Sequence, residues 1–234
     1  MIVERTEHPD WTSNAYLVAD APGGHGVLID GNGVAEPLLE RIEHDHITIT
    51  HVLVTHGHGD HVVDVDALAG RFAVPLLRWP GMADNQRVVS GDLRIQALYT
   101  PGHCTDHLAF VVNDSDVFTA DVLFKGTLGG TSGGGRDGFS DIKHSVMKRL
   151  MKLDLTARVH PGHTLPTTIG EEWETNPFIR IWRELDEESS DDCLVRGEPA
   201  TLILWAPDYD GTHKAWVRYP DGRDVIIGGS QVER

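Results

Sequence analysis

Apolar positions in the first half of the chain follow two periods, alternating in strand-like runs and recurring every three or four residues in helix-like stretches. Residues Leu38, Leu39 and Ile42 have helical spacing, and so does the set that begins at Val65. Glycine-rich turns separate the runs. The pattern predicts strand, strand, helix, strand, helix and strand, in that order, around residues 15–19, 26–30, 38–42, 52–54, 65–72 and 74–77. This order is typical of an α/β layer.

The second half adds more strands and one long amphipathic helix. Ile142, Val146, Leu150 and Leu153 mark one apolar helix face. Strands are predicted over residues 92–99, 108–112, 117–120 and 157–159. Several polar residues that can bind metals follow directly on these strands, where ligands are usually displayed.

The composition changes at Glu184, because residues 184–192 contain six acidic side chains. Beyond them the pattern predicts about three strands, over residues 201–205, 214–219 and 224–227, with a hairpin turn at 220–223. We therefore predict a main domain at 1–183, an acidic connection at 184–193 and a small β-appendage at 194–234. A sheet of about three strands is only marginally stable by itself. The appendage should therefore pack on the main domain or on another copy of the chain, as in a homo-oligomer. Trp205, Trp216 and Tyr219 are expected to pack there, and a binding face is the alternative.

Charge and composition narrow the class of protein. The 234 residues carry 20 Lys and Arg against 36 Asp and Glu, a net charge of −16, which repels nucleic acid. Two cysteines make no disulfide framework and favour a reducing compartment. No apolar run approaches the ~20 residues that span a bilayer, and no signal peptide is expected at the N-terminus. A cytoplasmic protein without membrane or nucleic-acid partners is expected.

Potential metal ligands are most concentrated in the stretch Thr55-His56-Gly57-His58-Gly59-Asp60-His61, which follows an apolar run. A glycine-containing loop leaving a buried strand lets three imidazoles and one carboxylate converge. Zinc and other borderline divalent metals prefer these ligands.

Three later segments supply matching partners: Thr100-Pro101-Gly102-His103, Thr119-Ala120-Asp121, and His160-Pro161-Gly162-His163. Together with the His-X-His-X-Asp-His stretch they resemble the ligand series of the metallo-β-lactamase superfamily. Over about residues 1–183 the chain is similar to short bacterial members of the glyoxalase II branch, the hydroxyacylglutathione hydrolases. The resemblance implies a four-layer αβ/βα sandwich, here with the β-appendage added.

The resemblance also implies a dinuclear metal site. In it His56, His58 and His103 hold one ion, Asp60, His61 and His163 hold the other, and Asp121 bridges both. Asp60 and Asp121 are thus the candidate catalytic residues. A water shared by two ions should ionise near neutral pH, and the resulting bridging hydroxide would attack the acyl carbon of a thioester. Zinc is the expected metal, with iron or manganese as alternatives.

The sequence says less about the substrate than about the metal centre. The helical glutathione-binding domain of the family has no counterpart in the sequence, so the thiol could be glutathione or a surrogate such as mycothiol. Lys125 and Arg136, in and beside the glycine-dense segment 126–138, are candidate contacts for a carboxylate-bearing thiol.

The main alternative is a persulfide dioxygenase, which uses one iron. Lactonase, β-lactamase and nuclease activities are weaker alternatives. The bridging Asp121 argues against a β-lactamase, and the charge argues against a nuclease.

Overall fold

The structure is a computed structural model that describes the backbone of residues 1–234 and every side chain except that of Arg136. The chain forms two compact units. The first unit comprises residues 1–99, 106–120 and 162–164, and the second comprises residues 100–105, 121–161 and 165–234. Each unit is described below by itself.

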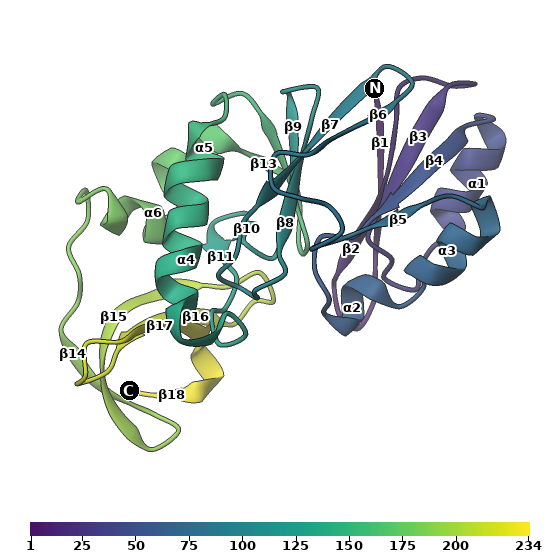
Figure 1. Ribbon diagram of the computed structural model, residues 1–234. Helices are drawn as coiled ribbons and strands as arrows, with labels where there is room; N and C mark the ends of the chain where they lie inside the picture. Colours follow the sequence, from purple (N-terminus) through teal and green to yellow (C-terminus); the bar gives the residue numbers. More distant parts are fainter. The chain divides into compact units, whose positions relative to one another are not determined.

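The first unit begins with a mixed five-stranded sheet (Figure 1). Its strands, hydrogen-bonded in chain order, are β1 (Ile2–Glu7), β2 (Asn14–Ala19), β3 (His25–Ile29), β4 (Thr48–Leu53) and β5 (Leu76–Leu77). The first three strands pair antiparallel, and β4 and β5 add in parallel. Strand β1 was not predicted, because its alternating apolar positions are few and its remaining side chains are charged or polar.

Two helices, α1 (Glu36–His44) and α3 (Val65–Phe72), lie side by side along this sheet in Figure 1. Proline lies in the first turn of α1, where a backbone N–H has no partner within the helix, so its missing N–H costs no hydrogen bond. Ala73 adopts a left-handed conformation (φ 52°) and ends α3. The apolar stripes predicted from the sequence pack against sheet residues such as Leu17, Leu28 and Val52 in one buried cluster.

The opposite face of the sheet packs on a second set of strands. These are β6 (Arg87–Ser90), β7 (Leu93–Tyr99), β8 (Leu108–Val112) and β9 (Asp116–Ala120), an antiparallel meander. Val18 and Ile29 of the first sheet share a buried cluster with Phe110 and Phe118 of the second. Tyr16 lies in the same cluster, and burial raises the pKa of its phenol well above the usual value. The first unit is therefore a helix layer on two packed sheets.

The segment after β4 differs from the expected loop. It has no regular secondary structure up to His58, and Gly59–Val62 then form the short helix α2. Asp60 and His61 thus lie on a helical turn. A helix of four residues lacks the periodicity by which a sequence pattern can be recognised, which explains the difference.

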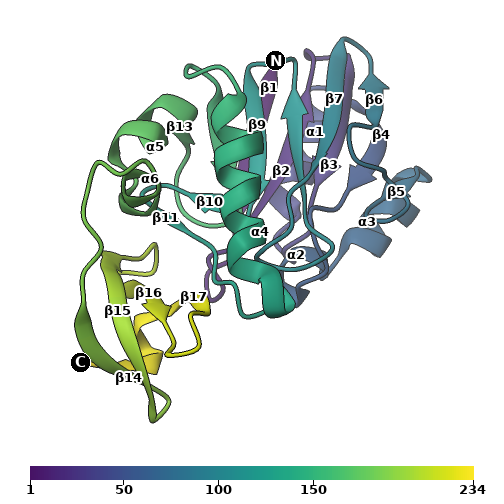
Figure 2. The same ribbon diagram turned by 60° about the vertical axis from the view of Figure 1, so that its left-hand side comes forward.

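The second unit contains the predicted amphipathic helix. Helix α4 (Gly138–His144) runs directly into a π-helical segment, η2 (Ser145–Arg149), and a 3₁₀ turn, η3 (Leu150–Lys152). Figure 2 shows the long helical ribbon labelled α4. The remaining short elements are the hairpin β10 (Leu123–Phe124) with β11 (Thr127–Leu128), the 3₁₀ turn η1 (Gly135–Asp137), the hairpin β12 (Arg158–Pro161) with β13 (Thr167–Thr168), α5 (Ile169–Thr175) and α6 (Pro177–Trp182).

Polar side chains fix the start of the two short helices. The Thr168 hydroxyl caps α5 by accepting from the Glu171 N–H, and the Asn176 side chain caps α6. The buried Glu172 carboxyl accepts hydrogen bonds from Gly126 and Asn176. Burial nevertheless raises the pKa of Glu172, against the effect of those hydrogen bonds.

The C-terminal part of the second unit is an antiparallel sheet of five strands, where the pattern predicted about three. Its strands are β14 (Asp191–Val195), β15 (Glu198–Pro207), β16 (His213–Arg218), β17 (Asp224–Gly228) and β18 (Val232–Glu233), and the 3₁₀ turn η4 (Gly229–Gln231) precedes the last. The spatial order is β17-β16-β15-β14-β18. Strand β14 begins inside the acidic connection, and its exposed acidic residues hid it from the apolar pattern.

Aromatic packing holds this sheet against the helices of the second unit. Trp216 is buried, with ring centroids 4.9 Å from Phe139 and 6.3 Å from Trp182. The packing interpretation of Trp216 is therefore confirmed. Trp205 and Tyr219 are half-buried at the edge of the sheet's own apolar cluster. Whether residues 194–234 form a separate domain stays a prediction.

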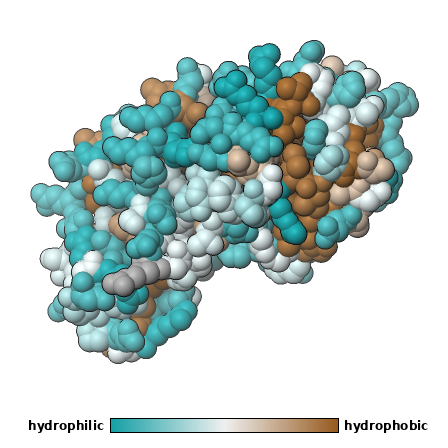
Figure 3. Space-filling model, viewed as in Figure 1, coloured by the Kyte–Doolittle hydropathy of each residue, from teal (hydrophilic) through white to brown (hydrophobic). Residues whose placement is uncertain are grey.

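Hydrophilic residues cover much of the face shown in Figure 3, and apolar residues gather over the strands of the first unit. No helix in the described part of the chain is both long and apolar enough to cross a membrane.

Candidate metal centre

The first set of candidate ligands in the first unit follows β4. The backbone N–H and the hydroxyl of Thr55 both donate to the Asp30 carboxylate, at 2.7 Å each. These bonds fix the chain just before His56. The Nε2 atom of His56 then lies 3.1 Å from Nδ1 of His58, so the two imidazoles converge on one point.

A second set is formed within the same unit by Asp60, His61 and His163. The Asp60 carboxylate lies 3.6 Å from Nε2 of His61 and 3.6 Å from Nε2 of His163. One ligand atom from each of the three residues lies within 4.8 Å of the others. These are nitrogen and carboxylate-oxygen donors, the set that zinc, iron and manganese accept. The chain thus contains a His/Asp cluster that could hold a metal ion.

In the second unit, His103 and Asp121 form a further pair. Nε2 of His103 lies 3.5 Å from the Asp121 carboxylate, while Nδ1 lies 2.8 Å from the carbonyl oxygen of Gly130. An imidazole that donates from Nδ1 to a carbonyl leaves its Nε2 lone pair available to a metal. Gly129 is required beside this pair, because a Cβ there would lie 1.8 Å from the Asp121 carbonyl oxygen.

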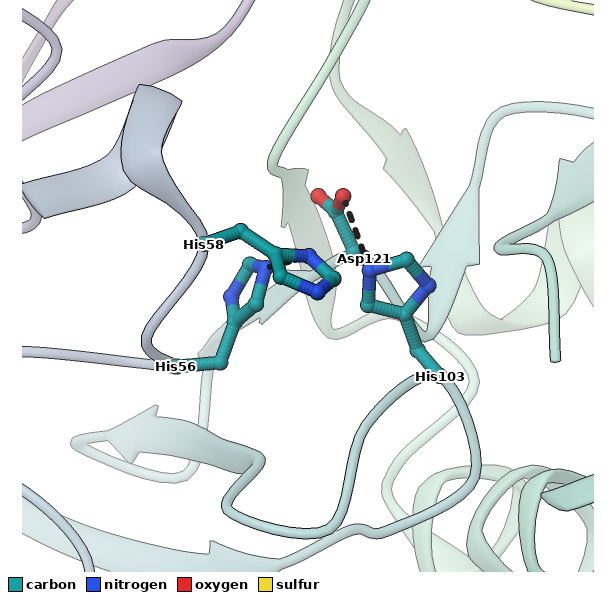
Figure 4. Close-up of side chains that lie close together, drawn as sticks. All are labelled: His56, His58, His103 and Asp121. Carbon is teal, nitrogen blue, oxygen red and sulfur yellow. Dashed lines mark hydrogen bonds and ion pairs between the residues drawn. The ribbon is translucent and has the colours of Figure 1, made fainter. Parts of the chain in front are cut away.

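Figure 4 shows the side chains of His56, His58, His103 and Asp121, with dashed lines joining the two histidines of the first pair and joining His103 to Asp121. Each of the four offers one ligand atom, and these atoms lie within 4.8 Å of one another. All seven residues predicted as ligands therefore occur in two such groups, four in one and three in the other.

Asp30 is a residue of the centre that sequence reasoning missed. Its carboxylate lies 3.1 Å from Nδ1 of His61, in addition to its two bonds with Thr55. Metal-binding histidines commonly donate their second N–H to a carboxylate, which fixes the ring and its tautomer. The sequence signal was an aspartate directly after an apolar strand, which is too common to be assigned by itself.

Thr12 is another residue that the sequence did not single out. Its hydroxyl lies 3.4 Å from Nδ1 of His163, and its backbone adopts the left-handed region (φ 55°). The neighbouring indole of Trp11 is exposed and stacks on His8.

His107 and Cys104 lie near the ligands in sequence or in space but belong to neither ligand group. The His107 ring is buried and stacks at 5.1 Å on His56. The Cys104 side chain is buried. Lys125 is exposed in the β10–β11 turn and forms an ion pair with Glu171 at 3.5 Å. The side chain of Arg136, the other predicted substrate contact, lies outside the described residues.

Comparison with known proteins identifies the superfamily. The family model of the metallo-β-lactamase superfamily matches residues 8–81. An uncharacterized protein of Mycobacterium tuberculosis is 30% identical over 207 residues, an alignment that covers 71% of this chain and 92% of the relative. The hydroxyacylglutathione hydrolase GloC of Haemophilus influenzae is 29% identical over 187 residues, covering 66% of this chain and 87% of the relative.

Two solved structures are similar as well. ETHE1 from Myxococcus xanthus has a TM-score of 0.68 and 28% identity, covering 80% of this chain and 92% of that one. A protein crystallised in a di-iron-bound form, TTHA1623, has a TM-score of 0.64 and 29% identity, covering 75% of this chain and all (100%) of that one. The chain belongs to the metallo-β-lactamase superfamily and has that superfamily's αβ/βα sandwich fold.

Proposed function

We propose that the protein is a dinuclear metal-dependent hydrolase that cleaves a thioester of a small thiol. The observation that carries the proposal is the presence of two groups of metal-compatible side chains rather than one. In the proposed assignment His56, His58 and His103 hold the first ion, Asp60, His61 and His163 hold the second, and Asp121 bridges the two.

The donor set fits an open, reactive centre better than a structural zinc site. Structural sites are closed by four ligands and usually include cysteine, whereas both groups here consist of imidazoles and carboxylates. A pair of divalent ions supplies a water that ionises near neutral pH and a positive field for a developing oxyanion. The chain's own contribution is to fix the rings: Asp30 orients His61, and the Gly130 carbonyl orients His103.

A thioester is the substrate class that the relatives support best. GloC is named a hydroxyacylglutathione hydrolase, and the chain aligns with 87% of its length. A thiolate is a good leaving group, so the site needs no dedicated general acid. We keep Lys125 as a proposed contact for the thiol's carboxylate, and Arg136 likewise.

Zinc is the proposed metal, and the di-iron form of a similar structure keeps iron as the alternative. Manganese is the third candidate. The two cysteines, Cys104 and Cys193, are both buried and are not joined in a disulfide, which supports a reducing, cytoplasmic setting. Assembly through the C-terminal sheet stays a prediction, as does the absence of nucleic-acid partners.

The test combines metal content with thiol release. The wild type is assayed with lactoyl-glutathione, with formyl- and acyl-mycothiol and with an acyl-CoA, after its metals per chain have been measured. Asp60→Ala should lose one metal and most activity, because it removes a carboxylate from the second group. Asp66→Ala, which changes an exposed acid in α3, is the matched control.

Two results would contradict the proposal. Two metals per chain with no thiol release from any substrate would contradict thioesterase activity, and lactones would then be the next substrates to assay. One iron per chain, with oxygen uptake in the presence of a persulfide, would make the protein a dioxygenase.

A further inference from the structure

A cavity of about 240 Å³ lies in the second unit, between the C-terminal sheet and the glycine-dense segment that follows β11. Its apolar lining includes Phe139, Val225 and Ile227, and Thr131 contributes from the glycine-dense side. A wider hollow of about 670 Å³ adjoins it and shares Gly135 and Arg223. The cavity has room for part of a small ligand, with an apolar floor and a polar rim.

Two arginines stand on that rim. The Arg223 guanidinium lies over the Tyr219 ring, 4.2 Å from its centroid, which holds the side chain in place and leaves its N–H groups available in the plane. The Asp221 carboxylate lies 3.8 Å from its Nε atom, and both groups are exposed, so that pair is weak. Arg196 donates one N–H to the Gln231 side chain at 2.6 Å.

The acidic residue that lines the cavity does not cancel this positive charge. Asp224 accepts from Trp216 Nε1 at 2.8 Å and from Arg218 Nε at 2.9 Å. Arg218 in turn binds Glu188 as well, and these hydrogen bonds raise the pKa of the Arg218 guanidinium. Arg218 is therefore shared between two carboxylates. The cavity lining itself carries two arginines, Arg196 and Arg223, against the one acid Asp224, which leaves one net positive charge there in a chain of net charge −16.

The cavity is joined to a proposed metal ligand by a very short stretch of chain. Gly130 accepts the hydrogen bond of His103, and the next two residues, Thr131 and Ser132, line the cavity. Between 129 and 135 these two are the only residues that are not glycine, so one short stretch of backbone both holds the ligand and lines the cavity. Gly130 is half-buried, and Ser132, Gly133 and Gly135 are exposed to solvent.

We propose that this cavity binds the thiol half of the substrate, and that Arg223, assisted by Arg196, recognises a carboxylate on it. The proposal rests on the thioesterase function proposed above and specifies its leaving group: a carboxylate-bearing peptide thiol such as glutathione, rather than a sugar-bearing thiol without carboxylates. Arginine pairs with a carboxylate through two parallel N–H bonds, which a neutral sugar cannot reproduce. The C-terminal sheet is then the specificity element of this chain.

The kinetic test compares two substrates that share one acyl group. S-lactoyl-glutathione carries carboxylates on its thiol half, and S-lactoyl-N-acetylcysteamine carries none. For Arg223→Gln we expect kcat/KM to fall about tenfold or more on the first substrate, mainly through KM, and to stay within about twofold on the second. Arg87→Gln, which removes an exposed arginine of β6, should change neither. Equal effects of Arg223→Gln on both substrates would overturn the proposal.

A binding measurement separates this inference from the proposed function. S-methylglutathione, which cannot be hydrolysed, is titrated calorimetrically into the wild type, Arg223→Gln and Arg87→Gln. Weaker binding by Arg223→Gln alone would support the cavity as the thiol site. This would hold even if no thioester were hydrolysed, because the absence of turnover would contradict only the proposed hydrolase function. Thioester turnover without any binding of S-methylglutathione, or with equal binding by all three proteins, would refute the cavity as the thiol site.

Discussion

Asp30 shows how one residue organises the neighbouring metal ligands. Its backbone is held in the left-handed region (φ 60°) at the end of β3, and its carboxylate is buried. From there it meets Thr55 and His61, which belong to different ends of the histidine-rich stretch. A carboxylate that is buried at a strained backbone position is retained where its contacts are functional.

Asp30→Asn tests this positioning role. The asparagine still accepts from Thr55, but it presents an amide N–H₂ or a weaker acceptor to His61, so the ring loses the partner that fixes its tautomer. We expect metal affinity at the second group to fall about 10- to 100-fold, with the first group little changed. Competition with a chromogenic chelator measures both steps.

Asp66→Asn in α3 is the control for the change of charge, because Asp66 is exposed. Unchanged binding of both ions by Asp30→Asn would show that Asp30 has no part in the centre. A far-UV spectrum that matches the wild type would establish that the variant is folded.

The sequence predicted the metal ligands better than their supports, for a physical reason. Ligand residues such as His56 and His58 have unusual side chains at short spacing, so they are visible locally. Supports such as Asp30 and Thr12 act through contacts with residues 31 and 151 positions away, and no local pattern encodes those contacts.

The helices and strands that the sequence predicted also differ physically from those that it missed. Helices α1 and α3 and strands β7 to β9 agree with the periodic pattern, because each buries a whole face in its own unit. Strands β14 and β18 were missed because they are short and mostly exposed, and they pair with each other although they lie far apart in the sequence. Helix α2 was missed because four residues complete only one turn.

The link between β17 and the glycine-dense segment is the element-scale feature that bears most on function. Thr131 donates its N–H to the Ile226 carbonyl at 2.9 Å, and its hydroxyl accepts from the Ile226 N–H at 2.9 Å. The preceding residue, Gly130, holds His103. The C-terminal sheet therefore helps to position a proposed metal ligand.

Thr131→Val removes the hydroxyl and leaves the Ile226 N–H buried without its acceptor. We expect the free energy of unfolding to fall by about 1–3 kcal/mol and the affinity of the first metal to fall with it. Denaturant unfolding with metal, and metal titration under native conditions, measure the two effects. Thr131→Ser keeps the hydroxyl and should resemble the wild type. Loss of stability with unchanged metal affinity would show that the link is only structural.

At the scale of the whole molecule, the proposed ligands come from four places in the chain, residues 56–61, 103, 121 and 163. In the unfolded chain these positions are dispersed, so metal ions should bind the folded state almost alone. Binding only to the folded state raises its stability, by about 4 kcal/mol for a ligand present at a thousand times its Kd.

Complete chelation should therefore lower the melting temperature clearly, and restoring the metal should recover it. Asp60→Ala, which is expected to hold one ion fewer, should show a smaller shift than the wild type, whereas Asp66→Ala should show the full shift. Calorimetric scans after the metal content has been verified provide the measurement. An equal melting temperature with and without metal would mean that the ligand groups do not bind ions in the folded protein, because a bound ion cannot fail to stabilise the only state that holds it.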